Sequence, residues 1–218
     1  MLHHEYAPLG MSDQNQNSKE YRAEQIRLKI RTAALEVFSD HGYQGASINK
    51  IAEAASMSTP RLLYYYKGKQ DLYVQVLRAS LEMWLTPLKM ISKNGDPQTE
   101  IFLYIKRKLF LAQAYPRESR LFAMEVLAGL PIVKSDLAQP LKQIFEDKVN
   151  LVNQWISEKK IIQHNPHHLF YSIWATTQHY ADFEAQIELI SGDEREMVFE
   201  EAEKHLLSMF RVWFIDPS

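Results

Sequence analysis

Apolar residues recur at intervals of three and four along most of the chain, which is the spacing of one face of an α-helix. The first clear set, in residues 20–40, is Ile26, Ile30, Ala33, Ala34, Val37 and Phe38. Gly42 follows and is expected to end this helix, because glycine is common just beyond a helix C-terminus. No segment alternates apolar and polar residues as a half-buried strand does. The pattern therefore predicts an all-α fold.

Proline and glycine divide the remaining chain into further helices. The predicted ranges are 69–92, 101–115, 117–128 and 132–160, then a deeply buried segment opened by Pro166, and a last helix after the break at 191–193. Pro87 should bend or end the helix that contains it. The last helix has an apolar stripe wide enough to serve two neighbours, and one of these would be another subunit.

Two short helical patterns joined by a tight polar turn lie within residues 47–72. Ser47 is placed as the N-cap of the first, whose buried face is Ile48, Ile51, Ala52 and Ala55. Ser58 is placed to cap the second, with Leu62 and Leu63 as its expected buried side. Two helices in this arrangement are typical of a helix-turn-helix, which inserts its second helix into the major groove of DNA.

The predicted DNA-contacting residues are Ser47, Ser58, Thr59, Arg61, Tyr64, Tyr65, Lys67 and Lys69. An arginine can pair bidentately with guanine, while hydroxyl groups and helix N-termini can contact phosphates. Lysines directly after the second helix would add phosphate contacts. Basic residues of the preceding helix would flank the groove, namely Arg22, Arg27, Lys29 and Arg31.

Composition and charge narrow the class of protein. The 218 residues are 46% hydrophobic and include no cysteine, which excludes disulfides and thiolate metal sites. No apolar run reaches the eighteen or so residues needed to span a bilayer, and the first residues do not form a secretory signal, so we expect a cytoplasmic protein. Residues 1–80 carry ten Lys and Arg against eight Asp and Glu, whereas residues 81–218 carry fifteen against nineteen. The basic excess thus lies with the predicted DNA-binding segment.

Trp174 and Gln178 lie four residues apart, on one face of an otherwise apolar helix. A buried amide needs hydrogen-bond partners, and the commoner arrangement is a bond to a neighbouring side chain or backbone group. The alternative is a ligand: the Gln178 amide offers both a donor and an acceptor to a ring edge that carries N–H and C=O groups, and Trp174 would stack on the ring. The residues alone leave both alternatives open.

The segment from His41 to Leu72 resembles the DNA-binding domain of the TetR family in the order and spacing of Ser47, Ile51, Ala52, Leu62, Tyr64, Tyr65, Lys67, Lys69 and Leu72. One departure is Ser56, where such proteins often have a turn glycine. The resemblance implies a three-helix helix-turn-helix domain at residues 20–68, and the polar character of the preceding residues 1–19 predicts a mobile tail. It also implies a larger helical domain at 69–218 that binds an effector and forms a homodimer, with operator DNA as the partner.

Three segments of the larger domain resemble a member of the family that regulates pyrimidine utilisation: residues 84–88, 120–131 and 174–183. This resemblance implies that the effector is a pyrimidine base such as uracil or thymine. It also favours the ligand-binding alternative for Trp174 and Gln178, with Trp84 as a second aromatic wall.

Two other functions remain as alternatives. A TetR-like regulator of efflux or another pathway would hold a larger apolar effector in a cavity lined by Met and Phe. A helical enzyme would use His179, Asp182 and Glu125 as acid and base groups, although no glycine-rich phosphate loop and no nucleophile with an adjacent base accompany them. Arg120 and Glu125 are either a core pair or polar groups of the effector site. We expect no catalytic residue, no cofactor and no metal site.

Overall fold

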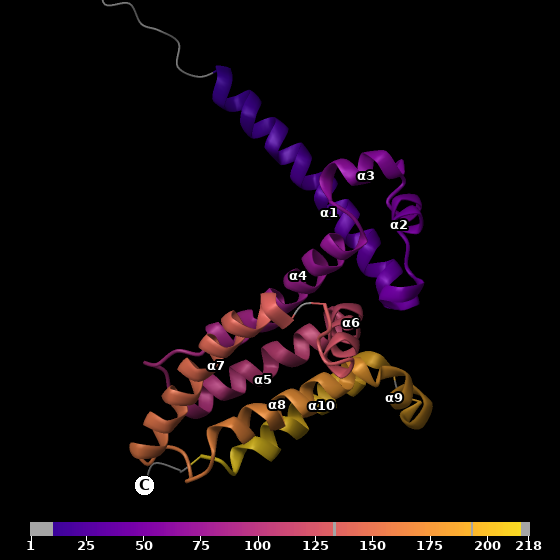
Figure 1. The fold of residues 1–218 in the computed structure, drawn as a ribbon. Helices are drawn as coiled ribbons and strands as arrows, with labels where there is room; N and C mark the ends of the chain where they lie inside the picture. Colours follow the sequence, from indigo (N-terminus) through magenta and orange to yellow (C-terminus); the bar gives the residue numbers. More distant parts are fainter. Residues whose placement is uncertain (1–10, 133, 193, 215–218) are drawn as a thin grey trace, which may run out of the picture. The chain divides into compact units, whose positions relative to one another are not determined.

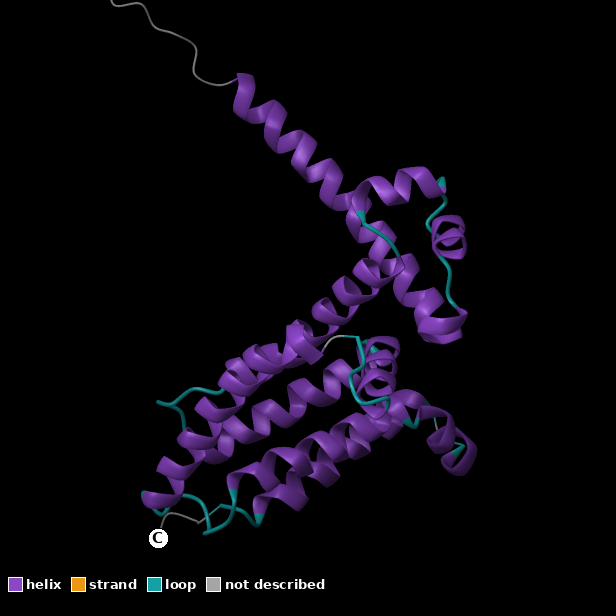
Figure 2. Cartoon of the chain, viewed as in Figure 1, coloured by secondary structure: helices purple, strands orange, loops and turns teal. Residues whose placement is uncertain are grey.

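The computed structural model describes residues 11–132, 134–192 and 194–214, and nearly all of them are helical (Figures 1 and 2). The described residues contain no β-strand, only an isolated bridge between Ile161 and Phe214. The prediction of an all-α fold is therefore confirmed. The chain divides into two compact units, residues 1–73 and 74–218, and their boundary falls inside helix α4 (Lys69–Lys89).

Unit 1 contains α1 (Met11–Gly45), α2 (Ile48–Ala54), α3 (Thr59–Tyr65) and the start of α4. The backbone of α1 leaves helical geometry at Gly42, where φ is 64°, a left-handed value that glycine adopts without strain. The helix begins earlier than predicted, since residues 11–19 of the expected mobile tail are helical and residues 1–10 lie outside the described part of the chain. Neither glycine nor proline interrupts residues 11–41, which explains the longer helix.

The core of unit 1 is built from the periodic apolar set of α1 and one face of each short helix. Ile30, Phe38 and Ile51 are fully buried, as is Leu62 of α3. The prediction that Leu63 is also buried is wrong, because its side chain is 46% exposed. Neighbouring residues of a helix point about 100° apart, so the side of α3 that buries Leu62 and, at the C-cap four residues on, Tyr66 leaves the adjacent Leu63 exposed.

Unit 2 contains the rest of α4 followed by α5 (Pro97–Ala114), α6 (Pro116–Leu127), α7 (Lys134–Ser157), α8 (Pro166–Asp182), α9 (Glu184–Ser191) and α10 (Arg195–Arg211). Helices α5, α6 and α8 begin with proline at the first position, where its missing N–H is not needed. The Asp96 carboxylate caps α5 by accepting a bond from Thr99 N at 2.9 Å. The sequence pattern did not predict α9, which is separated from α8 by non-helical backbone at Phe183.

Helices α5 and α8 form the centre of unit 2, and α10 lies alongside α5 (Figure 1). Tyr104 and Ile105 of α5 and Phe170 and Ile173 of α8 are at most 1% exposed. Helix α4 ends two residues after Pro87, at Lys89, in agreement with the expectation that this proline bends or ends the helix. In the described ranges, no helix is sufficiently long and apolar to cross a membrane.

Candidate nucleic-acid interface and ligand cavity

The turn between α2 and α3 sets the orientation of the two short helices. The Ser47 hydroxyl caps α2 by accepting a bond from Lys50 N at 3.2 Å. Ser56 adopts a left-handed φ of 52°, the conformation for which glycine is usual. The Thr59 hydroxyl then donates to the Asn49 side-chain oxygen at 2.9 Å, which ties the first turn of α3 to α2. These contacts fix the orientation of α3 relative to α2.

The outward side of α3 carries Arg61 and Tyr64, which point away from the core. Tyr64 is 83% exposed, an unusual environment for a large aromatic ring. Tyr65 is half-buried, with the guanidinium of Arg27 5.8 Å from its ring centroid. The exposed Leu63 adds an apolar group beside Arg61 and Tyr64, so the surface combines hydrogen-bonding and apolar side chains of the kind that contact base edges.

The basic residues predicted near α3 differ in their surroundings. Lys67 is exposed, while the Lys69 ammonium donates to the carbonyl oxygens of Tyr43 at 2.9 Å and Ala46 at 3.2 Å. The guanidinium of Arg31 likewise bonds internally, to the Glu24 carboxylate at 2.7 Å. Lys69 and Arg31 therefore support the fold of unit 1, and a phosphate would share Lys69 with these carbonyls.

Two serines at helix starts provide a matched test of capping in this unit. Ser58 is the N-cap residue of α3, but its side chain makes no capping bond, unlike that of Ser47. We expect Ser47→Ala to lower the free energy of unfolding of unit 1 by about 1 kcal/mol, and Ser58→Ala to lower it much less. Urea unfolding of the two variants measures the difference. Equal losses would contradict the assignment of Ser47 as the cap.

The three residues predicted to bind an effector, Trp84, Trp174 and Gln178, line one cavity of unit 2. This ligand cavity contains about 450 Å³ of space free of protein atoms, a volume that includes its opening to solvent. Its other lining residues are Leu81, Leu85, Leu88, Tyr104, Lys108, Phe122 and Leu141. The walls come from α4, α5, α6, α7 and α8 and are mainly apolar and aromatic.

Some polar groups of the ligand cavity have hydrogen-bond partners and others do not. Trp174 Nε1 donates to the Tyr104 hydroxyl at 2.7 Å, whereas Trp84 Nε1 is buried without a hydrogen-bond partner. The half-buried Gln178 amide makes no hydrogen bond with any residue in the described ranges. The first alternative for Gln178, a hydrogen bond to a neighbouring side chain or backbone group, is therefore not observed there. Unpartnered donors in an aromatic cavity leave hydrogen bonds for a ligand to complete.

Lys108 is a cavity residue that the sequence interpretation missed. It is 3% exposed, and its Nζ lies 3.7 Å from the centroid of the Trp84 ring. Burial lowers the pKa of Lys108 to about 7, although the nearby Asp182 carboxylate opposes this shift. A signal was present in the sequence: Lys108 follows Ile101, Tyr104 and Ile105 at intervals of seven, four and three, so it lies on the buried face of α5.

The acid and base groups considered for an enzyme have separate contacts. Asp182 Oδ1 accepts a hydrogen bond from the Ser119 hydroxyl at 2.5 Å, and burial raises the pKa of this carboxyl. His179 instead stacks on Phe183, with ring centroids 4.9 Å apart. The Glu125 carboxylate accepts from Ile132 N at 2.9 Å. Within the residues that the structure describes, no group of three or more possible ligands is placed to hold a metal ion.

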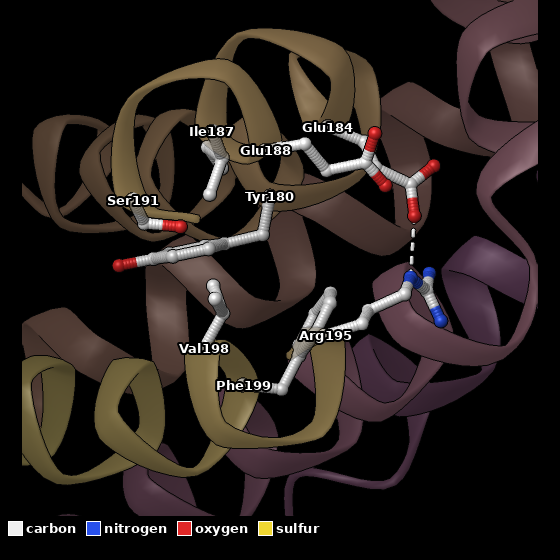
Figure 3. A pocket seen from close by; sticks show the side chains of 8 residues that line it. All are labelled: Tyr180, Glu184, Ile187, Glu188, Ser191, Arg195, Val198 and Phe199. Atoms are coloured by element: carbon white, nitrogen blue, oxygen red, sulfur yellow. Dashed lines mark hydrogen bonds and ion pairs between the residues drawn. The ribbon is translucent and has the colours of Figure 1, made fainter. Parts of the chain in front are cut away.

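A second, smaller hollow lies between the end of α8, α9 and the start of α10 (Figure 3). Tyr180, Ile187 and Val198 line this hollow, with the Tyr180 ring between the other two side chains in Figure 3, and the hollow contains about 270 Å³ of space, including its opening to solvent. An ion pair between Glu184 and Arg195 closes one side, and Glu184 also pairs with Arg120 of α6 at 2.9 Å. Arg120 and Glu125 thus have different partners, and Arg120 supports the junction of α6 with α9.

Comparisons with known proteins match both parts of the chain. A family model described as "Bacterial regulatory proteins, tetR family" matches residues 30–76, and one described as "YcdC-like protein, C-terminal region" matches residues 77–213. The HTH-type transcriptional regulator RutR of Escherichia coli (strain K12) is 43% identical over 163 residues, which cover 75% of this chain and 77% of that protein.

Solved structures support the same fold. The putative transcriptional regulator SCO4942 from Streptomyces coelicolor is 20% identical, with a TM-score of 0.65 over 88% of this chain and 99% of that one. AibR, solved in complex with isovaleryl coenzyme A and operator DNA, is 16% identical, with a TM-score of 0.64 over 87% of this chain and 100% of that one.

Proposed function

The chain belongs to the TetR family of DNA-binding transcriptional regulators, and we propose that it is a homodimer whose operator affinity falls when a pyrimidine base binds in the ligand cavity. The ligand part of this proposal rests on one observation: Trp84, Trp174 and Gln178 line the same cavity, and Trp84 Nε1 and the Gln178 amide have no hydrogen-bond partner in the described ranges. The resemblance of residues 84–88, 120–131 and 174–183 to a regulator of pyrimidine utilisation supports the choice of ligand class.

The chemistry of the ligand cavity suits a small planar ring with alternating C=O and N–H groups. Trp84 and Trp174 provide aromatic surfaces against which such a ring can pack. The Gln178 amide can donate to a ring carbonyl and accept from the adjacent ring N–H. The Trp84 N–H and the Lys108 ammonium are further donors for carbonyl oxygens. Uracil and thymine offer two carbonyls and two N–H groups on one ring.

We propose a dimer because a single copy of α3, the helix expected to enter the major groove, would contact few base pairs. Two copies of α3 spaced by about one turn of DNA, roughly 34 Å, would recognise a near-palindrome. Exposed apolar side chains on α9 and at the start of α10 support this region as the contact between copies: Leu189 is 86% exposed, Ile190 75% and Met197 50%. Isolated apolar groups are common on protein surfaces, but a cluster of this kind is typical of an interaction surface.

Coupling between ligand and operator would use α4. This helix contributes Leu81, Trp84, Leu85 and Leu88 to the wall of the ligand cavity, and its first residues, 69–73, belong to unit 1. A ligand that favours one position of α4 therefore biases the placement of the DNA-binding unit. The ligand can shift this equilibrium only by its preference between the two states, so ligand and operator must weaken each other by the same factor.

A titration of operator binding in the presence of uracil tests the proposal. An operator would first be selected from random duplexes with the full chain, and its affinity then measured by band shift. We expect saturating uracil to lower this affinity by about tenfold or more, which corresponds to roughly 1.4 kcal/mol of coupling. Gln178→Leu should need far more uracil for the same effect, whereas Gln163→Leu, a change at an exposed position, should not.

The possible outcomes separate the alternatives. Operator affinity that is unchanged by uracil, while calorimetry shows uracil to be bound, would reject the coupling. A response to larger apolar compounds but not to any pyrimidine would favour regulation of efflux or of another pathway. Turnover of a pyrimidine that is lost on replacing His179 would favour the enzyme alternative.

A further inference from the structure

The ligand cavity contains a buried positive charge without a direct counter-charge. Lys108 is 3% exposed, and the ring of Trp84 is its nearest recorded contact. Its ammonium has no hydrogen bond and no ion pair with any residue in the described ranges. A cation–π contact offsets only part of the cost of removing an ammonium from water.

Asp182 does not act as the missing partner. Its carboxylate favours the charged form of Lys108, but no ion pair within 4.0 Å joins the two, and Asp182 Oδ1 is already bonded to the Ser119 hydroxyl. Arg120 and His179 also act on Asp182, so its negative charge is shared among several cations. The remaining ionisable neighbour in the cavity wall is the Tyr104 hydroxyl, whose pKa is raised by burial and which stays neutral.

The other free polar groups of the ligand cavity are mostly donors. Trp84 is 6% exposed, and its Nε1–H has no partner, whereas the Nε1–H of Trp174 is already bonded to Tyr104. The acceptor available from a side chain is the amide oxygen of Gln178. A ligand that satisfies this cavity must therefore offer more acceptors than donors.

We infer that the ligand binds as a monoanion: a planar, oxygen-rich nitrogen heterocycle whose oxygens pair with the Lys108 ammonium and accept the Trp84 Nε1–H. This inference rests on the proposed function, because it specifies the charge of the pyrimidine that the cavity binds. A neutral base would leave the ammonium without a counter-charge, whereas an anion completes an ion pair in a site that is largely shielded from water.

Three probes that share one ring separate charge from shape. Uracil is neutral at pH 7, barbiturate is a ring anion with three oxygens, and orotate is the uracil ring carrying a carboxylate. Calorimetry on the full chain should show that barbiturate or orotate binds at least tenfold more tightly than uracil. Lys108→Met should abolish this preference, so that neither anion binds more tightly than uracil does. Lys106→Met removes an exposed lysine of the same helix, paired with Glu203, and should preserve the preference.

A second readout follows from the protonation of Lys108. Because burial lowers its pKa to about 7, most molecules hold a neutral amine at Lys108 at pH 8, and binding of an anion must restore the charge. Binding of barbiturate at pH 8 should therefore take up protons, measured as a dependence of the binding heat on the ionisation heat of the buffer. Binding of uracil should take up fewer protons.

Trp84→Phe provides an independent variant, since it keeps an aromatic ring but removes the N–H donor. It should weaken binding of the anionic probes several-fold. Equal affinity for uracil and both anions, or a preference that survives in Lys108→Met, would overturn the inference while the proposed function stands. No binding of any of the three probes would overturn both.

Discussion

The Lys108→Met variant is expected to be more stable than the parent protein at pH 7, by about 4 kcal/mol in the free energy of unfolding. The reason is that folding moves the Lys108 ammonium from water into the ligand cavity and lowers its pKa from 10.5 to about 7. Each pKa unit corresponds to about 1.4 kcal/mol, and methionine fills a similar volume without a charge. Urea unfolding at pH 7 measures the gain.

The same shift predicts how stability depends on pH. Between about pH 7 and pH 10.5 the unfolded chain binds more protons at Lys108 than the native protein does, so the free energy of unfolding of the parent rises with pH in this window. The advantage of Lys108→Met should shrink accordingly and nearly vanish by pH 10.5. Lys106→Met, on the exposed side of the same helix, should show no comparable gain at any pH. A destabilised Lys108→Met variant would contradict the argument.

The second large effect is expected at Arg61 of α3. Its exposed guanidinium lies beside Tyr64 on the outward side of the reading helix. A bidentate arginine–guanine pair contributes about 1 to 3 kcal/mol, and a dimer contains two such pairs. Arg61→Ala should therefore lower the affinity for a selected operator by roughly 30-fold or more. Fluorescence anisotropy with the operator and with a scrambled duplex of the same length measures both affinities.

The scrambled duplex distinguishes base recognition from phosphate contact. If Arg61 contacts a base, its replacement lowers the affinity for the operator much more than the affinity for the scrambled duplex. Similar losses on both duplexes would assign Arg61 to a phosphate instead. Arg117→Ala, at an exposed position of α6, serves as a control for the loss of one positive charge per chain.

Much of the fold follows from periodicity and from residues that start helices. The starts at Pro97, Pro116 and Pro166 agree with the breaks expected from the sequence, since the first position of a helix is the one that proline favours. The turn into α9 lacks such a marker, because the chain changes direction at Phe183 without glycine or proline. The exposure of Leu63 was also missed, because seven residues are too few for periodicity to separate adjacent positions.

The candidate site was predictable only in part. Trp174 and Gln178 share a helical face by their spacing, and the family resemblance added Trp84, so the sequence identified three residues that line one cavity. Lys108 was overlooked because lysine is rarely buried, although its position on the apolar face of α5 was visible. The internal bonds of Lys69 depend on carbonyl groups in the loop after α1, whose position no local pattern reveals.

The boundary between the two compact units lies within α4 and not in a loop, and this restricts how genes for such proteins can change length. Inserting one codon in this helix would rotate everything beyond it by about 100°, whereas seven codons would leave a residual rotation of only about 20°. Insertions and deletions that survive selection in α4 should therefore have lengths close to a whole number of helical turns, whereas length changes in loops are not restricted in this way.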